Sequence, residues 1–365
     1  MSARDIDTVG GHFILGLRPT PSLDPRDRAL LQELKPAGVV LFKSNFRHDL
    51  PYEGWLASHL RLIEEVRAAI GRPNILIGVD HEGGRVCRTP APITRYAAAR
   101  RWASSAAAVG RAMGRELASL AINVSFAPVL DIHTNPANPV IGPRAFGSTP
   151  EDVTAAALPF MRALQGQGVI ACGKHFPGHG DTSVDSHLGL PRQDRSLDEL
   201  RARELKPFAA AIDAGAQMLM SSHILFPAVD PDHPVTLSRR FVTEVLREEM
   251  GFSGVVVSDD VGMGAMQAYF ADPRAAAQLI GAGTDLLMVC AHFTDVDRAR
   301  AFAAAIVEAR DDGRLDPATL ERSRARVELL LSRAPLHQVQ LLTEHTFKTH
   351  RAAGEIFLAE TAEVM

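Results

Sequence analysis

The chain has 365 residues, of which 46% are apolar, and a formal net charge of −4 with acidic and basic residues interspersed. This length allows one large α/β domain or two smaller ones, and the charge pattern offers no basic face for nucleic acid. The first residues contain no apolar signal segment and no run is long enough to span a bilayer, so we expect a cytoplasmic protein with no membrane partner. Cys87, Cys172 and Cys290 lie far apart and are expected to be reduced thiols.

Short apolar runs alternate with longer amphipathic stretches along most of the chain. The runs predicted to be strands are residues 12–17, 38–42, 75–80, 123–131, 169–175, 217–223, 254–260 and 285–290. The stretches predicted to be helices are residues 24–35, 55–70, 101–120, 151–167, 198–214, 238–250, 273–281 and 295–310. The strands are nearly continuous hydrophobic runs, which is typical of parallel strands covered on both faces.

Eight such units favour a (β/α)₈ barrel over a doubly wound sheet. A doubly wound sheet would need a glycine-rich phosphate loop after an early strand, and Gly83-Gly84, which follows charged residues, does not fit that pattern. We therefore predict a single TIM-type barrel over residues 1–334, with a further helix at 316–333 across its outside. Residues 335–365 are expected to form a helical tail of unknown role, packed on the barrel or on a second subunit of a weak homodimer.

Polar residues follow the predicted strands at several successive positions. In a barrel the loops after the strands converge on one mouth, so these residues become neighbours. A single aspartate at such a place is more often a helix N-cap than a catalyst, but the whole set indicates an active site. The set consists of Asp80, His81, Glu82, Asp131, His133, Arg144, Lys174, His175, His223, Asp259 and Asp260.

The richest segment is residues 174–187, with the sequence KHFPGHGDTSVDSH. Proline and glycine prevent it from continuing as a strand or helix, so it places titratable groups on a loop at a strand end. In an extended segment residues i and i+2 point the same way, so Asp185 can hold one ring nitrogen of His187 while the other faces a reacting group. The competing interpretation is a solvated surface turn.

Four motifs carry a resemblance to a known family. They are IGVDHEGGRV at 77–86, NPVIGPRAFG at 138–147, KHFPGHGD at 174–181 with DSH at 185–187, and VSDD at 257–260. Together they resemble glycoside hydrolase family 3, in particular its bacterial β-N-acetylglucosaminidase branch, over about residues 10–330. One departure is His81, where relatives often have glutamine.

The resemblance implies a role for each matching residue. Asp259 matches the nucleophile, which leaves Asp260 as a helix cap, and His187 paired with Asp185 matches the acid/base group. A carboxylate accepts from neighbouring hydroxyls while arginine and lysine donate, which suits sugar binding by Asp80, Arg144, Lys174 and His175. His179 and Asp181 are expected to support the loop through backbone hydrogen bonds. Arg85 and His223 are expected to give further support to the site.

The implied function is a retaining exo-β-N-acetylglucosaminidase (a β-N-acetylhexosaminidase) that forms a covalent glycosyl-aspartate. Its expected substrates are cell-wall fragments, either muropeptides that contain N-acetylglucosamine or chitooligosaccharides, and its expected role is peptidoglycan recycling. The resemblance implies no cofactor and no metal.

Three alternatives stay open. Another family 3 β-glycosidase, or a phosphorylase of N-acetylglucosaminides, would share the same motifs. A metal-dependent barrel hydrolase would take its ligands from His175, His179, Asp181, His187, His223 and Asp259, although no strand shows the His-x-His pair that puts two imidazoles on one face. A sugar-binding protein without turnover would not need both a nucleophile and a proton donor.

Overall fold

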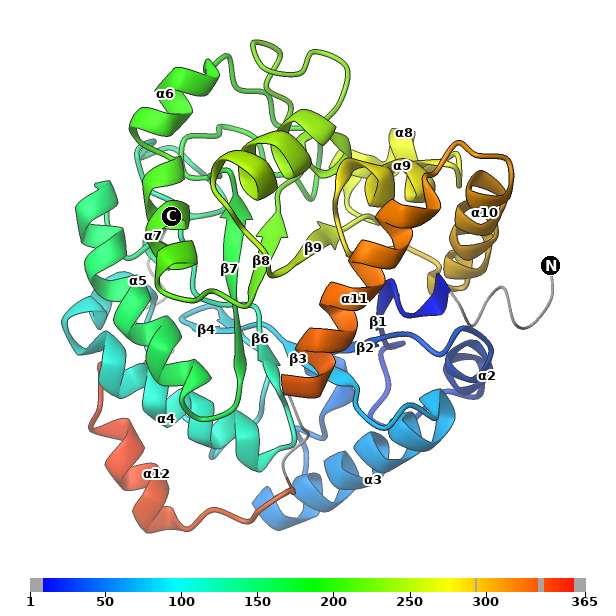
Figure 1. Ribbon diagram of the computed structural model, residues 1–365. Helices are drawn as coiled ribbons and strands as arrows, with labels where there is room; N and C mark the ends of the chain where they lie inside the picture. Colours follow the sequence, from blue (N-terminus) through cyan, green and yellow to red (C-terminus); the bar gives the residue numbers. More distant parts are fainter. Residues whose placement is uncertain (1–8, 293, 334–337, 358–365) are drawn as a thin grey trace.

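The computed structural model describes residues 9–292, 294–333 and 338–357, and its centre is a closed barrel (Figure 1). All neighbouring strands are parallel, in the order β1-β10-β9-β8-β7-β6-β3-β2. The strands of the barrel are β1 (Phe13–Gly16), β2 (Gly38–Leu41), β3 (Leu76–Val79), β6 (Val124–Ser125), β7 (Ile170–Phe176), β8 (Met218–Ser221), β9 (Val255–Asp260) and β10 (Leu286–Cys290). The predicted (β/α)₈ barrel is therefore confirmed.

Helices surround the barrel, and short 3₁₀ segments lie in several loops. The helices are α2 (Pro25–Leu34), α3 (Tyr52–Ile70), α4 (Ala106–Ser119), α5 (Pro150–Gln165), α6 (Leu197–Ala202), α7 (Leu205–Asp213), the π-helix η6 (Arg240–Glu249), α8 (Gln267–Phe270), α9 (Ala275–Ala282), α10 (Ala299–Asp311), α11 (Pro317–Arg333) and α12 (Glu344–Arg351). Within the described residues no helix is both long enough and apolar enough to cross a bilayer.

Local signals explain where several of these elements begin. Helix α5 starts after Thr149, whose hydroxyl accepts from the Asp152 N–H at 3.1 Å, with Pro150 at the first helical position. The helix predicted at 198–214 is interrupted and forms α6 and α7, and a capping box between Ser196 and Glu199 starts α6.

The fourth strand is much shorter than predicted. Strand β6 ends at Ser125, although residues 123–131 were expected to be strand. Pro128 has no N–H and cannot donate to a neighbouring strand, so the chain continues beside β7 irregularly. It is held there by hydrogen bonds from Lys174 N to Pro128 O and from Leu130 N to Lys174 O, at 3.1 and 2.6 Å.

A small hairpin that the sequence pattern did not predict follows β3. Its strands are β4 (His81–Gly83) and β5 (Val86–Cys87), which pair antiparallel. The turn needs positive φ angles, 102° at Gly83 and 57° at Gly84, that glycine adopts without strain. The hairpin brings Arg85 and Arg88 to the barrel mouth.

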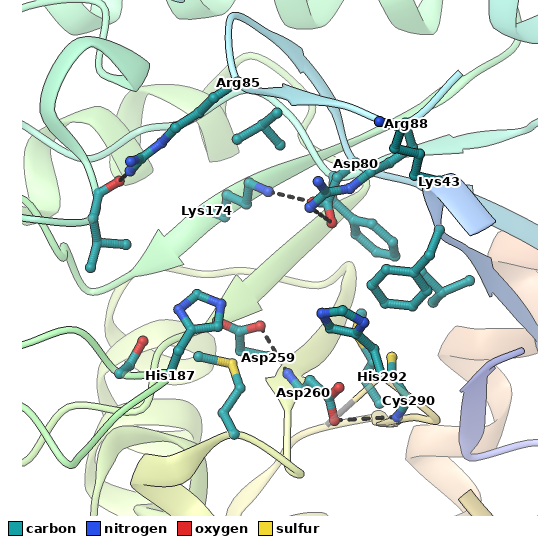
Figure 2. A pocket seen from close by; sticks show the side chains of 18 of the residues that line it. Lys43, Asp80, Arg85, Arg88, Lys174, His187, Asp259, Asp260, Cys290 and His292 are labelled. Carbon is teal, nitrogen blue, oxygen red and sulfur yellow. Dashed lines mark hydrogen bonds and ion pairs between the residues drawn. The ribbon is translucent and has the colours of Figure 1, made fainter. Parts of the chain in front are cut away.

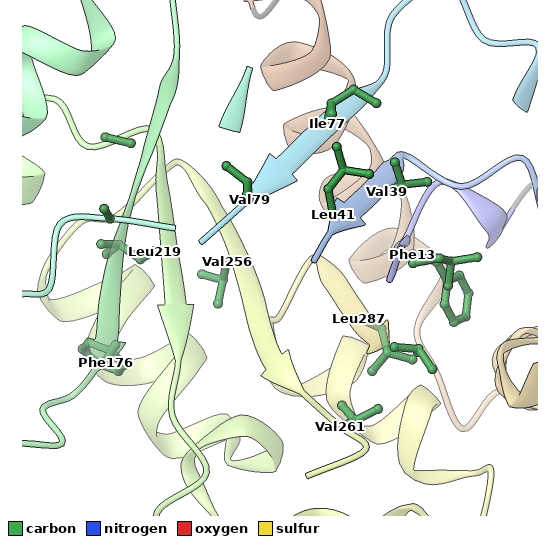
Figure 3. Close-up of a cluster of buried hydrophobic side chains, with 14 of the residues drawn as sticks. Phe13, Val39, Leu41, Ile77, Val79, Phe176, Leu219, Val256, Val261 and Leu287 are labelled. Carbon is green, nitrogen blue, oxygen red and sulfur yellow. The ribbon is translucent and has the colours of Figure 1, made fainter. Parts of the chain in front are cut away.

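Alternate strand residues face two different hydrophobic layers. The outer layer lies between the barrel and the helices and includes Phe13, Val39, Ile77, Leu219 and Val256 (Figure 3). The inner layer fills the barrel with the intervening residues, among them Ile14, Val40, Leu76, Met218 and Val257. Burial on both faces accounts for the continuous apolar runs of the sequence.

Helix α11 does not simply lie across the outside, as the sequence pattern suggested. Its residues Val327, Leu330 and Leu331 belong to the inner layer together with Ala37, which directly precedes β2. The helix therefore covers the end of the barrel at which the strands begin, opposite the mouth.

The described part of the tail packs on the barrel's own helices. Helix α12 contacts α4, and the His350 ring nitrogen Nδ1 lies 2.7 Å from a buried Glu116 carboxylate oxygen on α4. Tyr96 donates its hydroxyl to His350 O at 2.6 Å, and the ring of Phe347 packs edge-on against Tyr52. The sequence allowed the tail to pack on the barrel or on a second subunit, and the structure shows its described part packed on the barrel. Residues 334–337 and 358–365 of the expected tail lie outside the described residues.

Candidate active site

A pocket of about 990 Å³ lies at the ends of the strands where the loops converge. Nine of the eleven residues that the resemblance gave a catalytic, sugar-binding or supporting role line it, as does Asp260, and Figure 2 shows several of them facing one another across it. The nine are Asp80, Arg85, Arg144, Lys174, His175, His179, Asp185, His187 and Asp259. Asp181 and His223 are not in the lining.

One wall of the pocket is a buried ion-pair cluster, formed by Asp80, Glu82, Arg144 and Lys174. Glu82 accepts two hydrogen bonds from Arg144, both at 2.8 Å, and lies 2.6 Å from the Lys174 ammonium. Lys174 also donates to Asp80 at 2.8 Å. Strand β7 supplies the lysine, the segment after β3 supplies both acids, and the loop after β6 supplies Arg144.

All four members of the ion-pair cluster are held in their charged forms. Burial by itself would raise the pKa of Glu82, but Arg144 and Lys174 hold it well below its usual value. The pKa of Asp80 is likewise lowered, against burial, by the charge of Lys174. Burial opposes the charge of Lys174 too, yet the two carboxylates raise its pKa. The Asp80 side chain, 23% exposed against 4% for Glu82, is the carboxylate open to a ligand.

A second buried carboxylate orients His175. Asp131 accepts from the His175 ring nitrogen Nδ1 at 2.6 Å and from the backbone N–H groups of His175 and His179, at 3.1 and 2.7 Å. Burial would raise the pKa of Asp131, but these partners lower it. The sequence pattern marks Asp131 only as a strand-end residue, whereas the structure makes it the brace of this loop.

Asp259 and Asp260 end strand β9, with Asp259 in the pocket lining. Burial opposes ionisation of Asp259, but the neighbouring His223 and His175 rings and the Asp260 N–H, which donates at 2.8 Å, lower its pKa. Asp259 is therefore ionised at neutral pH, as a nucleophile must be. His223 itself is fully buried between Thr236 and the Asp260 carbonyl oxygen.

His187 lies at the mouth of the pocket, in a loop formed by residues 182–190 that we call the dyad loop. The Asp185 carboxylate accepts from the His187 ring nitrogen Nδ1 at 2.6 Å and from its backbone N–H at 2.9 Å. The pairing comes from a side-chain turn closed by Asp185, not from the extended segment predicted from the sequence. His187 is 43% exposed, and its Asp185 partner 29%.

The dyad loop is held by hydrogen bonds at both of its ends. The two ring nitrogens of His179 make hydrogen bonds with hydroxyl groups of the loop, Nδ1 with Thr182 at 2.7 Å and Nε2 with Ser186 at 3.3 Å. On the other side, Gly264 N donates to His187 O at 3.2 Å and Ala265 N donates to Ser186 O at 3.1 Å. The loop thus rests on the segment that follows β9, which brings His187 toward the same pocket as Asp259.

Asp181 anchors the base of this loop through its backbone, as expected from the sequence, since its carbonyl oxygen accepts from Gln193 Nε2 at 2.6 Å, and also through its side chain. It accepts from Arg195 at 2.8 Å, from Arg203 at 3.1 Å and from Thr134 at 3.1 Å. Asp260, in contrast, differs from its expected role as a helix cap. Its Oδ1 accepts from Gly262 N at 2.9 Å, which closes a turn after β9, and from Cys290 N at 3.3 Å.

Several pocket residues were not predicted from the sequence. Lys43 and His292 follow strands β2 and β10, so the rule that collected the other strand-end residues would have found them. Phe42 stacks on the His292 ring, with centroids 5.3 Å apart. Arg88 needed the hairpin after β3 to reach the mouth, and no local signal indicated it.

The alternative of a metal-dependent hydrolase finds no support in the geometry of the described chain. Within residues 9–292, 294–333 and 338–357, no three side chains of the His, Cys, Asp and Glu types are grouped so that they could hold a metal ion. The proposed ligands instead have protein partners, such as Thr236 for His223 and Arg195 for Asp181.

Comparison with known proteins agrees with the motif resemblance. Residues 18–330 match the model of the glycosyl hydrolase family 3 N terminal domain. The beta-hexosaminidase of Methylococcus capsulatus is 40% identical over 279 residues, which cover 74% of this chain and 80% of that protein.

Longer relatives match as well. Beta-hexosaminidase A of Pseudoalteromonas piscicida is 31% identical over 379 residues, which cover 94% of this chain but only 62% of that protein. The solved structure of a family 3 beta-N-acetylglucosaminidase from Paenibacillus superposes with a TM-score of 0.85 at 32% identity, over 95% of this chain and 68% of that one. This chain thus spans about two thirds of the length of these two relatives. From its motifs, its barrel and these matches, the chain belongs to glycosyl hydrolase family 3.

Proposed function

We propose that the protein is a retaining exo-β-N-acetylglucosaminidase, which removes a terminal β-linked N-acetylglucosamine. The observation that carries this proposal is that one pocket is lined by Asp259, by the Asp185–His187 pair and by Asp80 with Lys174. It combines a nucleophile, a proton donor and a set of hydroxyl-binding groups. The names of the relatives, which include a beta-N-acetylglucosaminidase, support the choice of sugar.

The first step forms a glycosyl-enzyme. Asp259, kept ionised by its neighbours, attacks the anomeric carbon, and the bond from that carbon to the leaving oxygen breaks. Since Asp185 holds Nδ1 of His187, Nε2 is the nitrogen that gives its proton to the leaving oxygen. The nearby carboxylate fixes the tautomer and the orientation of the ring.

The second step releases the sugar and restores the enzyme. A water molecule attacks the anomeric carbon from the side that the leaving group vacated, and the bond to Asp259 breaks. His187, now neutral, takes the proton of the water on Nε2. Two displacements at the same carbon retain the β configuration.

The ion-pair cluster is suited to bind the sugar at the end remote from Asp259. Asp80 accepts hydrogen bonds from hydroxyls, and Lys174 donates to them from between its two acids. The Arg144 guanidinium donates chiefly to Glu82. We therefore propose that Arg144 contributes to sugar binding indirectly, by holding the ion-pair cluster in place.

The substrates proposed are N-acetylglucosamine-containing fragments of the cell wall. The pocket is at the upper end of the size range of small-molecule sites, which leaves space for a leaving group besides one sugar ring. Turnover of such fragments in the cytoplasm stays a prediction.

One panel of measurements tests the proposal. Rates on aryl β-N-acetylglucosaminide, β-glucoside and β-xyloside should favour the first substrate, and a 2-deoxy-2-fluoro or 5-fluoro glycosyl fluoride should label Asp259, as read by peptide mass spectrometry. Label on another residue would contradict the assignment of the nucleophile. Release of a sugar 1-phosphate in the presence of phosphate would show the protein to be a phosphorylase.

A further inference from the structure

An unpartnered carboxylate oxygen lies beside the nucleophile. Asp260 is only 3% exposed, and its Oδ2 has no hydrogen-bond partner at normal distance among the described residues, although the Cys290 thiol lies beside the carboxyl group. Its Oδ1, in contrast, accepts from Gly262 N and Cys290 N. A buried oxygen without a partner costs free energy unless something fills its hydrogen-bonding capacity. Since Asp260 lines the pocket, a ligand can do so.

Asp260 belongs to one side of the pocket, which we call the β10–β2 lobe. The lobe consists of Phe42, Lys43, Arg88, Asp260, Cys290 and His292. Figure 2 shows its labelled members on the side of the pocket away from His187 and Arg85. A leaving group has to lie next to the proton donor His187, so the β10–β2 lobe is free for part of the terminal sugar itself.

The position of Asp260 in the chain selects the part of the sugar that it can reach. Asp259 has to touch the anomeric carbon, and the hydroxyls at C3 and C4 lie at the far end of the ring, near Asp80 and Lys174. The groups that remain close to the residue after Asp259 are the acetamido group at C2 and the hydroxyl on C6. Both carry a hydrogen-bond donor, an N–H or an O–H.

From this we infer that Asp260 is a substrate-binding residue, whose Oδ2 accepts a hydrogen bond from the sugar's C2 acetamido N–H or C6 hydroxyl. The inference rests on the proposed function for its choice of sugar. It gives the second aspartate of the VSDD motif a role that the sequence had left as a helix cap. No other chain or cofactor is needed.

The chemistry of the group fits this role in both of its protonation states. Burial raises the pKa of Asp260 to about 7. Because Oδ1 already accepts two N–H groups, a bound proton resides on Oδ2, and that oxygen then donates to a hydroxyl or to an amide carbonyl. When ionised, it accepts from an O–H or N–H. A sugar substituent that both donates and accepts can therefore satisfy Oδ2 at any pH near neutral.

The test is sugar binding, measured by calorimetry on Asp260→Asn at a pH well above 7, where the Asp260 carboxylate is ionised and its Oδ2 only accepts. Asparagine keeps the oxygen that faces Gly262 and Cys290 but places an NH₂ where Oδ2 was. We expect N-acetylglucosamine to bind about 10- to 100-fold more weakly, the size of one hydrogen bond to a charged group. Asp260→Ser, which retains an acceptor for the Gly262 turn, should weaken binding similarly and serves if the asparagine variant does not fold.

Modified sugars identify the contact. If Oδ2 binds the C2 group, the loss caused by Asp260→Asn disappears with 2-deoxyglucose, and if it binds the C6 hydroxyl, the loss disappears with 6-deoxy-N-acetylglucosamine. Either result supports the inference. Equal losses on all three sugars, or no loss on any, would overturn it. Since binding needs no turnover, these results are separate from a failure to hydrolyse.

A matched control is available just before the neighbouring strand, β10. The Thr284 hydroxyl is also fully buried and unpartnered among the described residues, but it is not in the pocket lining. Thr284→Val should therefore leave sugar binding unchanged. A loss as large as that of Asp260→Asn would mean that any buried change near β10 disturbs the pocket, and the inference would fall.

Discussion

The two sides of the pocket are built in opposite ways. The members of the ion-pair cluster lie at strand ends and in the segments that follow them. The Lys174 and Glu82 side chains are 3% and 4% exposed, and every member of the cluster is paired within the protein. The proton donor, in contrast, lies on the dyad loop, where His187 is 43% exposed and its partner is two residues away in the same turn.

The difference follows from what each side has to do. Hydroxyl-binding groups act best when they are fixed before the sugar arrives, and a buried network of four charges provides that rigidity. A proton donor that meets leaving groups of different shape and then a water molecule has to stay accessible. We therefore expect changes in the cluster to affect folding as well as activity, and changes in the dyad loop to affect activity alone.

Asp259 stands between the two sides, and its removal should have the largest effect. Asp259→Ala should lower kcat on the order of 10⁵-fold, the scale observed when other enzymes lose a nucleophile. Binding of N-acetylglucosamine, measured by calorimetry, should be largely retained because the ion-pair cluster is intact. More than a trace of remaining turnover in the purified variant would contradict its role.

Breaking the ion-pair cluster tests the stability half of the comparison. Glu82→Gln removes the charge that both Arg144 and Lys174 face, and it should lower the free energy of unfolding by about 3–5 kcal/mol. Urea denaturation followed by circular dichroism measures this loss. Asp272→Asn, which breaks the solvent-exposed pair with Arg274, should leave stability nearly unchanged. Similar results for the two variants would contradict the contrast between buried and exposed pairs.

Removing the proton donor tests the other half. His187→Ala should slow hydrolysis of glycosides with poor leaving groups by about 10²–10⁴-fold, because these leave only when protonated. Aryl glycosides with strongly acidic phenols should be far less affected, and the urea midpoint should not change. Steady-state rates on a series of phenols give the comparison. Equal losses across the series would exclude His187 as the acid.

The contact between the dyad loop and the segment after β9 offers the smallest and most local test. A Cβ added at Gly264 would lie 2.6 Å from His187 O and 2.9 Å from the Leu188 carbonyl carbon, so the loop has to move. Gly264→Ala should lower kcat between about tenfold and a hundredfold, as expected for a small misplacement of a catalytic group.

Its control is Gly281→Ala in helix α9. There the nearest atom, Leu315 Cδ1, is 3.6 Å away, an ordinary contact. This variant should retain full activity. If Gly264→Ala is equally active, the contact between the dyad loop and the segment after β9 has no part in placing His187.

The barrel and most of its site residues could be predicted from the amino-acid sequence alone. All eight barrel strands were predicted, because strands buried on both faces leave apolar runs that are visible locally. Nine of the eleven residues given a role by the resemblance, and Asp260, line the pocket, and those at strand ends do so because parallel strands in a barrel end at one mouth. The same rule, applied to the second and eighth strands, would have added Lys43 and His292.

Only the tertiary structure decided the hydrogen-bond and ion-pair partners of these residues. Nothing near Asp131 indicates that it holds His175, or that Glu82 occupies Arg144, since each pair joins segments more than 40 residues apart. The turn at Asp185, the packing of α12 on α4 and the unpartnered oxygen of Asp260 likewise depend on the path of whole loops. Strand identity is set by short-range pattern, whereas hydrogen-bond partners are set by which distant segments the closed barrel brings together.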